Sequence, residues 1–262
     1  MTFIEANMEI YRTLRRPYTW VTFAWEELKD RYQRSMLGML WIPVSFLMFV
    51  GVKVLVFSKL SQADIGAFSV HVVIGYWIWQ TLNAFAIDSG HIFVRAGGYI
   101  KSSPLPYAVY VLQALFRNTV PFLSNFVITL VVCGFATGSV ALQFLWVIPT
   151  YFVLALNAIW LFFLIGVIGA RYRDVVHLIQ TMMRVLFFIT PIIWVPAQLG
   201  RTGELIALFN PFAHYINLVR EPVASGTVPV LSWLVVLSIT LVGWLVASLI
   251  YSHNRRNIVH WV

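Results

Sequence analysis

The chain has 262 residues, of which 60% are hydrophobic and 11% are charged, and its mean hydropathy is +0.81. A soluble domain carries about 25% charged residues, so this composition excludes a protein whose surface is bathed entirely in water and indicates lipid as the solvent. The net charge of +8 does not require a nucleic-acid partner, because cytoplasmic loops that face an anionic leaflet explain an excess of Lys and Arg in a membrane protein.

A single transmembrane domain is expected over residues 1–262, because no charged or Gly/Ser-rich linker divides the chain. We expect residues 1–36 to form a cytoplasmic and interfacial N-terminus, residues 37–251 a six-span bundle, and residues 252–262 a cytoplasmic tail. The first 35 residues carry too many charges for a secretory signal peptide, so the first apolar span is expected to stay in the mature protein. Cys133 is the only cysteine, which excludes an intrachain disulfide.

Residues 18–34 have the pattern of an amphipathic helix. Its apolar face carries Val21, Ala24, Trp25, Leu28 and Tyr32 at helical spacing, and charged residues populate the opposite face. Such a helix lies in the headgroup plane with its arginines on the lipid phosphates. A solvated helix ahead of a membrane anchor is the alternative. The direct continuation into the first span favours the interfacial position.

Six apolar stretches are long enough to cross the hydrocarbon layer as helices, which takes about 20 residues each. They are Leu37–Phe57, Phe68–Ile87, Ala108–Val132, Leu142–Gly169, Val175–Val195 and Leu231–Tyr251. A seventh apolar run, Leu205–Val219, is interrupted by Asn210-Pro211 and is too short to span, so a re-entrant or interfacial hairpin is expected there. The expected fold class is an all-α membrane protein with six transmembrane helices.

The distribution of Lys and Arg orients these spans, because cytoplasmic loops are enriched in both residues. With the N-terminus inside, the cytoplasmic segments hold Arg12, Arg15, Arg16, Lys29, Arg31, Arg34, Arg95, Lys101, Arg171, Arg173, Arg255 and Arg256. The opposite side holds Lys59, Arg201 and Arg220. We therefore expect a multi-pass protein of the bacterial inner membrane with both termini in the cytoplasm. A seventh crossing would move the Arg255-Arg256 pair outside.

Residues 91–106 form the cytoplasmic loop between spans two and three, where a Gly-Gly pair and two prolines predict interruptions of the helix. Gly97-Gly98 followed by Lys101-Ser102 faintly resembles a phosphate-binding loop. That motif requires a glycine directly before the lysine, and Ile100 stands there instead, so nucleotide binding is not expected. The loop is expected either to be solvated or to dock a soluble partner.

Residues 196–230 lie on the outward side between spans five and six and contain several turn points. Long loops without regular structure are uncommon, so we expect short outward-facing helices packed at the membrane surface. A lid over an exit and simple packing remain two open alternatives on the residues alone. The candidate gate residues are Asn210, Pro211 and Arg220.

Arg184 is the most informative ionisable residue at membrane depth, where such residues usually face the bundle interior or a wet cavity. It lies about 15 Å from the cytoplasmic end of span five at 1.5 Å per residue. The same stripe carries His177, Gln180, Thr181, Phe187 and Phe188. We interpret this polar and aromatic stripe as the lining of a pathway. The alternative is that Arg184 pairs with a carbonyl or carboxylate and locks two helices together.

Three further charged residues are less informative. Lys53 is expected to snorkel to the outer interface. Arg117 is expected either to reach the inner headgroups or to pair within the bundle, and Asp88 is expected to be hydrated at a span end. Residues that share a helical face with Lys53 are Trp41, Ser45 and Phe49.

The common chemical motifs are missing, because the sequence contains no HExxH motif, no cluster of Cys and His and no GxSxG elbow. No metal site or catalytic residue is therefore expected. A membrane transferase acting on lipid-linked sugars is the weaker alternative, since it needs positioned acid and base groups. The available groups are scattered along the chain, namely His71, Asp88, His91, Asp174 and His177.

Four segments carry a family resemblance: Arg31–Trp41, the Lys101–Pro106 loop, Tyr172–Val175 running to Phe188–Ile192, and Asn210–Arg220. In this order and spacing they resemble the membrane-spanning subunit of ABC exporters for lipid-linked polysaccharides, the group that moves O-antigens, capsules and teichoic acids. The resemblance covers essentially the whole chain. Each segment alone is degenerate, but the set is fairly specific.

The resemblance implies an assembly of two such subunits with two separate cytoplasmic ABC ATPase subunits. ATP and Mg would then bind the partner, and no cofactor is expected in this chain. The segment with Arg95, Tyr99 and Lys101 would match the family's coupling helix, and residues 18–34 its interfacial helix. Residues 196–230 would match the short helices that gate the outward exit. Spans one and five would line a conduit formed by two copies.

The implied substrate is a polyprenyl-diphosphate-linked glycan of the O-antigen type, and another amphiphile such as a lipid or drug is the alternative load. Sugars pack their C–H faces on aromatic rings and need polar partners for their hydroxyls. The conduit candidates are Trp41, Ser45, Phe49, His177, Gln180, Thr181, Arg184, Phe187 and Phe188. Arginine forks match phosphate oxygens, so Arg31, Arg34 and Arg184 are the candidates for the carrier diphosphate.

Overall fold

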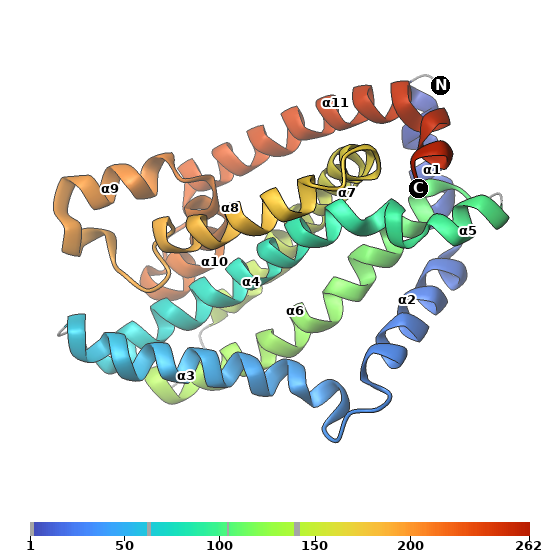
Figure 1. Ribbon diagram of the computed structural model, residues 1–262. Helices are drawn as coiled ribbons and strands as arrows, with labels where there is room; N and C mark the ends of the chain where they lie inside the picture. Colours follow the sequence, from blue (N-terminus) through green and yellow to red (C-terminus); the bar gives the residue numbers. More distant parts are fainter. Residues whose placement is uncertain (1–2, 62–63, 104, 139–141) are drawn as a thin grey trace.

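The computed structural model describes residues 3–61, 64–103, 105–138 and 142–262, with the side chains of residues 3–7 and 57–61 left aside. Within these ranges every regular element is a helix (Figure 1). The α-helices are α1 (Phe3–Leu14), α2 (Pro17–Tyr32), α3 (Trp41–Ser61), α4 (Ile65–Arg95), α5 (Gly97–Ser102), α6 (Tyr107–Thr137), α7 (Val147–Arg171), α8 (Val175–Ile189), α9 (Gly200–Phe209), α10 (Pro211–Ser225) and α11 (Val230–Trp261). Three 3₁₀ turns accompany them: η1 (Gly38–Leu40), η2 (Leu142–Trp146) and η3 (Pro196–Leu199).

Five of the described helical segments are long and apolar enough to cross a membrane: Gly38–Val56, Ile65–Ser102, Tyr107–Thr137, Leu142–Arg171 and Val230–Trp261. This confirms an all-helical, multi-pass membrane protein. The expected fifth span, residues 175–195, does not form one continuous helix. Its helix, α8, has 15 residues and ends at Ile189. Thr190 adopts extended backbone angles there, because it precedes Pro191 and a residue before proline disfavours the helical region.

Two helices run farther toward the end of the bundle that holds both termini than the hydrophobicity predicts. The expected loop 91–106 is helical up to Arg95 and resumes as α5 after a break at Ala96. The expected tail 252–262 is the continuation of α11. The physical reason is that hydropathy marks only the residues that lie within the hydrocarbon layer. The helix itself continues beyond that layer until Gly, Pro or an unfavourable cap ends it.

Helix α4 lies at the centre of the bundle and packs against α3, α6, α7, α8 and α10. Its most apolar window is 67% buried, whereas that of α3 is 11% buried. A helix that is apolar all round suits a buried position. Close packing of α4 on α7 depends on glycine, because a Cβ on Gly169 would collide with the Gly90 backbone. α3 lies at the edge in Figure 1, with apolar residues such as Leu47, Met48 and Val52 exposed.

Both chain termini lie at the same end of the bundle in Figure 1. Glu9 of α1 is buried there and joins three elements: its carboxylate accepts from the Ala108 backbone N–H (3.3 Å), from the Tyr251 hydroxyl (3.3 Å) and from Arg255 Nη2 (3.0 Å). Ala108 stands in the first turn of α6, where backbone N–H groups lack partners within the helix. Helix α1 therefore fixes the start of α6 against the end of α11.

Candidate functional site

A polar pocket of about 360 Å³ opens between α3, α4 and α6, next to the end of α2. We call it the amide pocket. Each helix contributes one face at helical spacing. The lining residues are Arg31 and Tyr32 of α2, Trp41, Ile42 and Ser45 of α3, Gln80, Thr81, Ala84, Ile87 and Asp88 of α4, and Asn118, Pro121, Phe122 and Asn125 of α6.

Two side-chain amides form the deepest polar part of this pocket. Asn125 Nδ2 donates to Gln80 Oε1 over 3.2 Å, and Asn125 is only 2% exposed. Gln80 stands fifteen residues from either end of α4, so both amides lie near the middle of the membrane. The buried Asn125 Oδ1 has no hydrogen-bond partner among the described residues. A buried polar atom without a partner is costly, which makes this position notable.

The amide pocket brings together residues that the sequence analysis assigned to separate roles. Trp41 and Ser45 were conduit candidates, and Arg31 was a diphosphate candidate; all three line it. Ser45 itself bonds to the Trp41 carbonyl over 2.6 Å, so its hydroxyl is partly used within α3. Arg34 is exposed in the turn after α2 and lies outside the pocket.

A second cluster joins α3, α4 and α8 nearer the outer end. Lys53 of α3 lies over the Tyr76 ring of α4, 3.4 Å from its centroid, and 4.9 Å from the Phe187 centroid of α8. The ring of Phe49 is 5.3 Å from the same ammonium. Lys53 thus contacts aromatic rings within the bundle, and the expectation that it snorkels to the interface is wrong. An aromatic face attracts a cation strongly enough to hold it there.

The predicted stripe on α8 forms an open face in the single chain. His177, Thr181, Arg184 and Phe188 are exposed at helical spacing, while Gln180 and Phe187 are half-buried. In the part of the chain that the structure describes, Arg184 has neither a hydrogen bond nor an ion pair. The helix-locking alternative for Arg184 is therefore not realised within one chain. A pathway role stays a prediction.

The end of the bundle that holds both termini carries an ion network around Arg117, for which the sequence left two alternatives open. Arg117 of α6 is buried and pairs with Glu27 of α2 and with Asp88 of α4, the latter over 2.8 Å between Nη2 and Oδ2. Asn118 Nδ2 donates to the same Asp88 oxygen over 2.8 Å, and Arg95 Nη1 lies 3.3 Å from its other oxygen. Of the two alternatives for Arg117, pairing within the bundle is confirmed. The expectation of a hydrated Asp88 is wrong, because α4 continues past Ile87.

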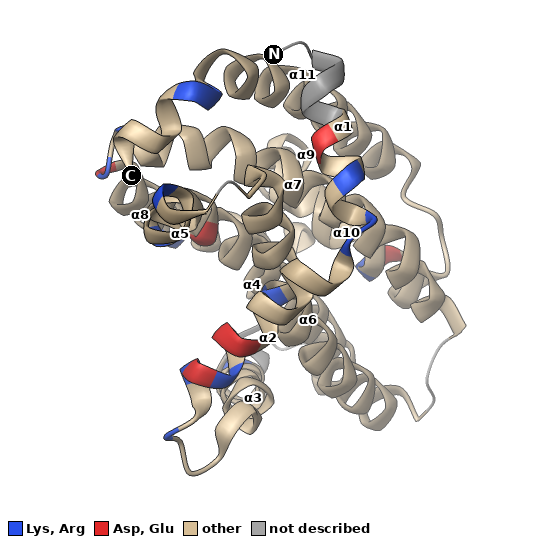
Figure 2. Cartoon of the chain, turned by 90° about the vertical axis from the view of Figure 1, so that its right-hand side faces the viewer, with Lys and Arg blue, Asp and Glu red and all other residues tan. Residues whose placement is uncertain are grey.

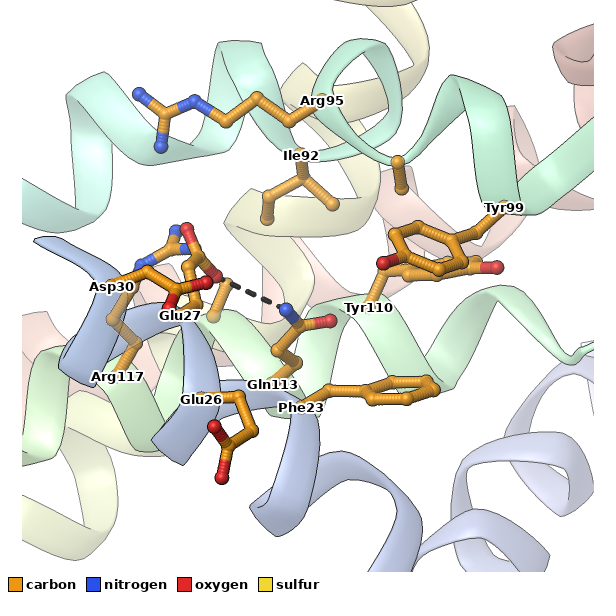
Figure 3. A pocket seen from close by; sticks show the side chains of 12 residues that line it. Phe23, Glu26, Glu27, Asp30, Ile92, Arg95, Tyr99, Tyr110, Gln113 and Arg117 are labelled. Carbon is orange, nitrogen blue, oxygen red and sulfur yellow. Dashed lines mark hydrogen bonds and ion pairs between the residues drawn. The ribbon is translucent and has the colours of Figure 1, made fainter.

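Figure 2 looks onto this end of the molecule, and its coloured charged residues are prominent on α2 and on the near ends of the helices. Close to the ion network, a cavity of about 320 Å³ lies between α2, α4, α5 and α6 (Figure 3). Its carboxylate side carries Glu26, Glu27 and Asp30, and its aromatic side carries Phe23 and Tyr99. α2 thus contacts the short helix α5 through side chains of this cavity.

The predicted coupling residues lie around α5. Tyr99 is 59% exposed, and its ring centroid lies 5.8 Å from that of Phe23. Lys101 is exposed in the last turn of α5. Arg95 closes α4 one residue before α5 begins and faces the same cavity. The short helix therefore stands between solvent and α2, in contact with both.

The predicted gate residues tie the outer helices to the end of α8. Asn210 caps α10 by accepting from the Phe212 N–H (2.9 Å), and its Nδ2 donates to Thr190 Oγ1 (3.0 Å). Pro211 occupies the first turn of α10. Arg220 is buried; its Nη1 donates to the Pro191 carbonyl (2.8 Å) and its Nη2 to the His71 carbonyl (3.1 Å). Burial lowers the pKa of Arg220 to about 9, so the residue is cationic at neutral pH.

The similarity of this chain to known proteins covers most of the helices described above. A model of the ABC-2 type transporter family matches residues 18–224, which run from α2 to α10. The chain belongs to this family. Among its relatives is the O-antigen export system permease protein RfbA of Klebsiella pneumoniae, 24% identical over 206 residues that cover 77% of this chain and 78% of the relative. The RfbA permease of Myxococcus xanthus is 26% identical over 184 residues, covering 66% and 67%.

Several residues of this ABC-2 transporter chain escaped the sequence analysis. Gln80, Asn118 and Asn125 line the amide pocket, and Tyr76 holds Lys53. Their signal was present, because uncharged amides inside apolar spans are uncommon and usually face a cavity or each other. Gln180 and Thr181 drew attention because they share a helical stripe with the charged Arg184, whereas these amides lie on α4 and α6, away from that signal.

Proposed function

We propose that this chain is the membrane-spanning half of an ATP-driven exporter that moves a lipid-linked polysaccharide, of the O-antigen type, across the inner membrane. The similarity over 77% of the chain to permeases named for O-antigen export carries this proposal. The membrane-depth pocket with amides and aromatic rings supports it, because a glycan offers hydroxyls and C–H faces to such groups. The chain itself is a transport component and not an enzyme.

ATP hydrolysis belongs, in this proposal, to a separate pair of cytoplasmic ABC ATPase subunits. ABC-2 membership supports an ATPase partner, and ATP with Mg would bind there. The exposed ring of Tyr99 and the exposed Lys101 on α5 are the surface that we assign to ATPase docking. From α5 the contact of Tyr99 with Phe23 leads to α2, and from α2 the pairing of Glu27 with Arg117 leads into the bundle.

Six crossings remain our proposal for the topology, with α8 as the short one. Both termini lie at one end of the bundle, which an even number of crossings requires. α8 spans about 22 Å at 1.5 Å per residue, and Thr190–Val195 extend it toward the outer side. The excess of Lys and Arg at the end with both termini supports a cytoplasmic position for that end.

Two copies of the chain would enclose the conduit. The exposed apolar residues of α3 and the exposed polar stripe of α8 are the surfaces that lack a cover in one chain. Facing pairs of α3 and α8 would place Trp41, Phe49, Arg184 and Phe188 around the passage. On the outward side α9 and α10, held by Asn210 and Arg220, would form the gate.

The test is deletion of the coding gene followed by complementation. We expect surface polysaccharide to disappear and lipid-linked glycan to accumulate inside, and the wild-type chain together with its neighbouring ATPase to restore export. A strain that keeps its surface polysaccharide after deletion would rule out this function. Loss of a different surface lipid with unchanged polysaccharide would indicate the alternative amphiphile.

A further inference from the structure

We infer that the amide pocket binds the first sugar of the lipid-linked glycan, and that Asn125 and Gln80 hydrogen-bond one of its hydroxyl groups. This inference rests on the proposed function and assigns its substrate contact to α4 and α6, in addition to the conduit stripes of α3 and α8. A pocket of about 360 Å³ falls in the usual range of small-molecule sites, about 300–1,000 Å³.

The amide atoms of Asn125 and Gln80 that lack a hydrogen-bond partner indicate which chemical group the ligand must offer. The single bond between them, from Asn125 Nδ2 to Gln80 Oε1, leaves Asn125 Oδ1 as a free acceptor. Among the described residues Gln80 Nε2 also makes no hydrogen bond, so it is a free donor. Asn125 Oδ1 is closed to solvent in the free pocket, so binding requires the Asn125 amide to rotate toward the pocket; a hydroxyl group then donates to Oδ1 and accepts from Nε2.

The charges of the pocket favour a neutral ring over a bare phosphate. Asp88 is already engaged by Arg117 and Asn118, and Arg31 stands at the α2 side of the lining. Arg31 is the one Lys or Arg among the described lining residues, and its Nη2 lies 3.9 Å from Glu27 Oε1, so a phosphate seated among the amides would meet no free cation. The rings of Trp41 and Phe122 also line the pocket and suit the C–H faces of a sugar.

The arrangement along the membrane gives the ligand an order. Arg31 belongs to the last turn of α2 at the cytoplasmic end, whereas Gln80 lies in the middle of α4. The carrier diphosphate would therefore lie near Arg31, and the first sugar, which is attached to it, would lie deeper in the bundle near Gln80. This order fits a carrier whose headgroup lies at the inner interface while its first sugar enters the bundle.

The test uses the chain purified with its ATPase subunit in lipid nanodiscs and two radiolabelled probes. One probe is a polyprenyl diphosphate that carries a single hexose, and the other is the same lipid without the sugar. We expect the wild type to bind the sugar-bearing probe about tenfold more tightly. Asn125→Leu and Gln80→Met should each abolish this preference and leave the affinity for the bare lipid within about twofold.

Asn254→Leu is the matched control. The Asn254 side chain bonds to the Ile250 carbonyl of its own helix (2.9 Å) and lies away from the amide pocket, so the preference should persist. Thermal stability separates a ligand role from a structural one. The double variant Gln80→Met/Asn125→Leu removes both partners of their mutual hydrogen bond, so it should be close to neutral for stability. A structural role for the pair would instead lower the melting temperature of this double variant.

Three outcomes would overturn the inference. They are a wild type without preference for the sugar, an Asn125→Leu variant that keeps the preference, and a variant that weakens both probes equally. Surface polysaccharide is measured in the same strains. Restored polysaccharide together with any of these outcomes refutes the sugar site alone, whereas polysaccharide that survives gene deletion refutes the proposed function.

Discussion

Arg117 of α6 and Asp88 of α4 form a buried ion pair, with Nη2 and Oδ2 2.8 Å apart and side chains 7% and 15% exposed. Glu27 of α2 binds the other arm of the same guanidinium. One arginine thus connects the interfacial helix with two membrane helices. Because a buried pair loses far more when one partner is removed than it gains when formed, this contact is a sensitive point of the fold.

Asp88→Ala is expected to destabilise the chain by about 3–5 kcal/mol, because it leaves the Arg117 charge buried with Glu27 as its remaining carboxylate partner. Thermal denaturation of the purified chain in detergent measures the loss. The double variant Asp88→Ala/Arg117→Met should recover part of it, since the buried charges are gone and Glu27, which is 31% exposed, still lies 3.9 Å from Arg31. Equal stability of the wild type and Asp88→Ala would contradict the pairing.

Arg184→Ala is expected to reduce export at least tenfold while stability and assembly with the ATPase remain. The guanidinium is exposed on α8 and has no partner among the residues described, so its removal breaks no contact within the chain. Surface polysaccharide reports export, and co-purification reports assembly. Arg117→Ala serves as the contrast and should fail in both assays. Loss of assembly in Arg184→Ala would indicate a locking contact with the second copy.

Gly169→Ala is expected to destabilise by about 1–3 kcal/mol, because overpacking forces α4 and α7 apart. The added methyl would meet the backbone of Gly90, which cannot turn away as a side chain can. Gly51→Ala is the matched control on α3, where nothing lies within 4 Å of the new Cβ. It should be neutral or slightly stabilising. Similar melting temperatures for the two variants would argue against close α4–α7 packing.

Tyr99→Ala is expected to uncouple ATP hydrolysis from export without loss of stability. Its ring is exposed on α5 and touches Phe23 of α2, so its loss would break the proposed route from the ATPase to α2 at little cost to the core. Hydrolysis by the purified complex should stay within about twofold while export falls. Tyr18→Ala is the control, because Tyr18 is 83% exposed on α2. If Tyr18→Ala also uncouples hydrolysis from export, the effect is not specific to Tyr99.

Hydropathy located the apolar segments well, because the cost of burying polar groups in lipid acts residue by residue along the chain. Hydropathy gave wrong expectations where the structure depends on the residue at which a helix ends. The break before Pro191 shortened α8, and the uninterrupted helix beyond Ile87 carried Asp88 into the ion network. Both signals are local and were readable from proline and glycine positions.

The candidate site was predicted only in part, for a different reason. Trp41 and Ser45 share a helix face, which periodicity reveals. Their meeting with Gln80 and Asn125 depends on how three helices cross, and no pattern within one helix contains that information. Likewise, the burial of Arg220 follows from its contacts with the His71 and Pro191 carbonyls, 149 and 29 residues away in sequence.

The Glu9 junction has a consequence for how the protein is made. Its carboxylate binds Tyr251 and Arg255, which leave the ribosome 242 residues or more after Glu9 itself. Helix α1 therefore gains these two partners only after helices α4 to α10 have been made. A chain that stops before Tyr251 keeps the Glu9 carboxylate without them, and its first helix is not joined to α11.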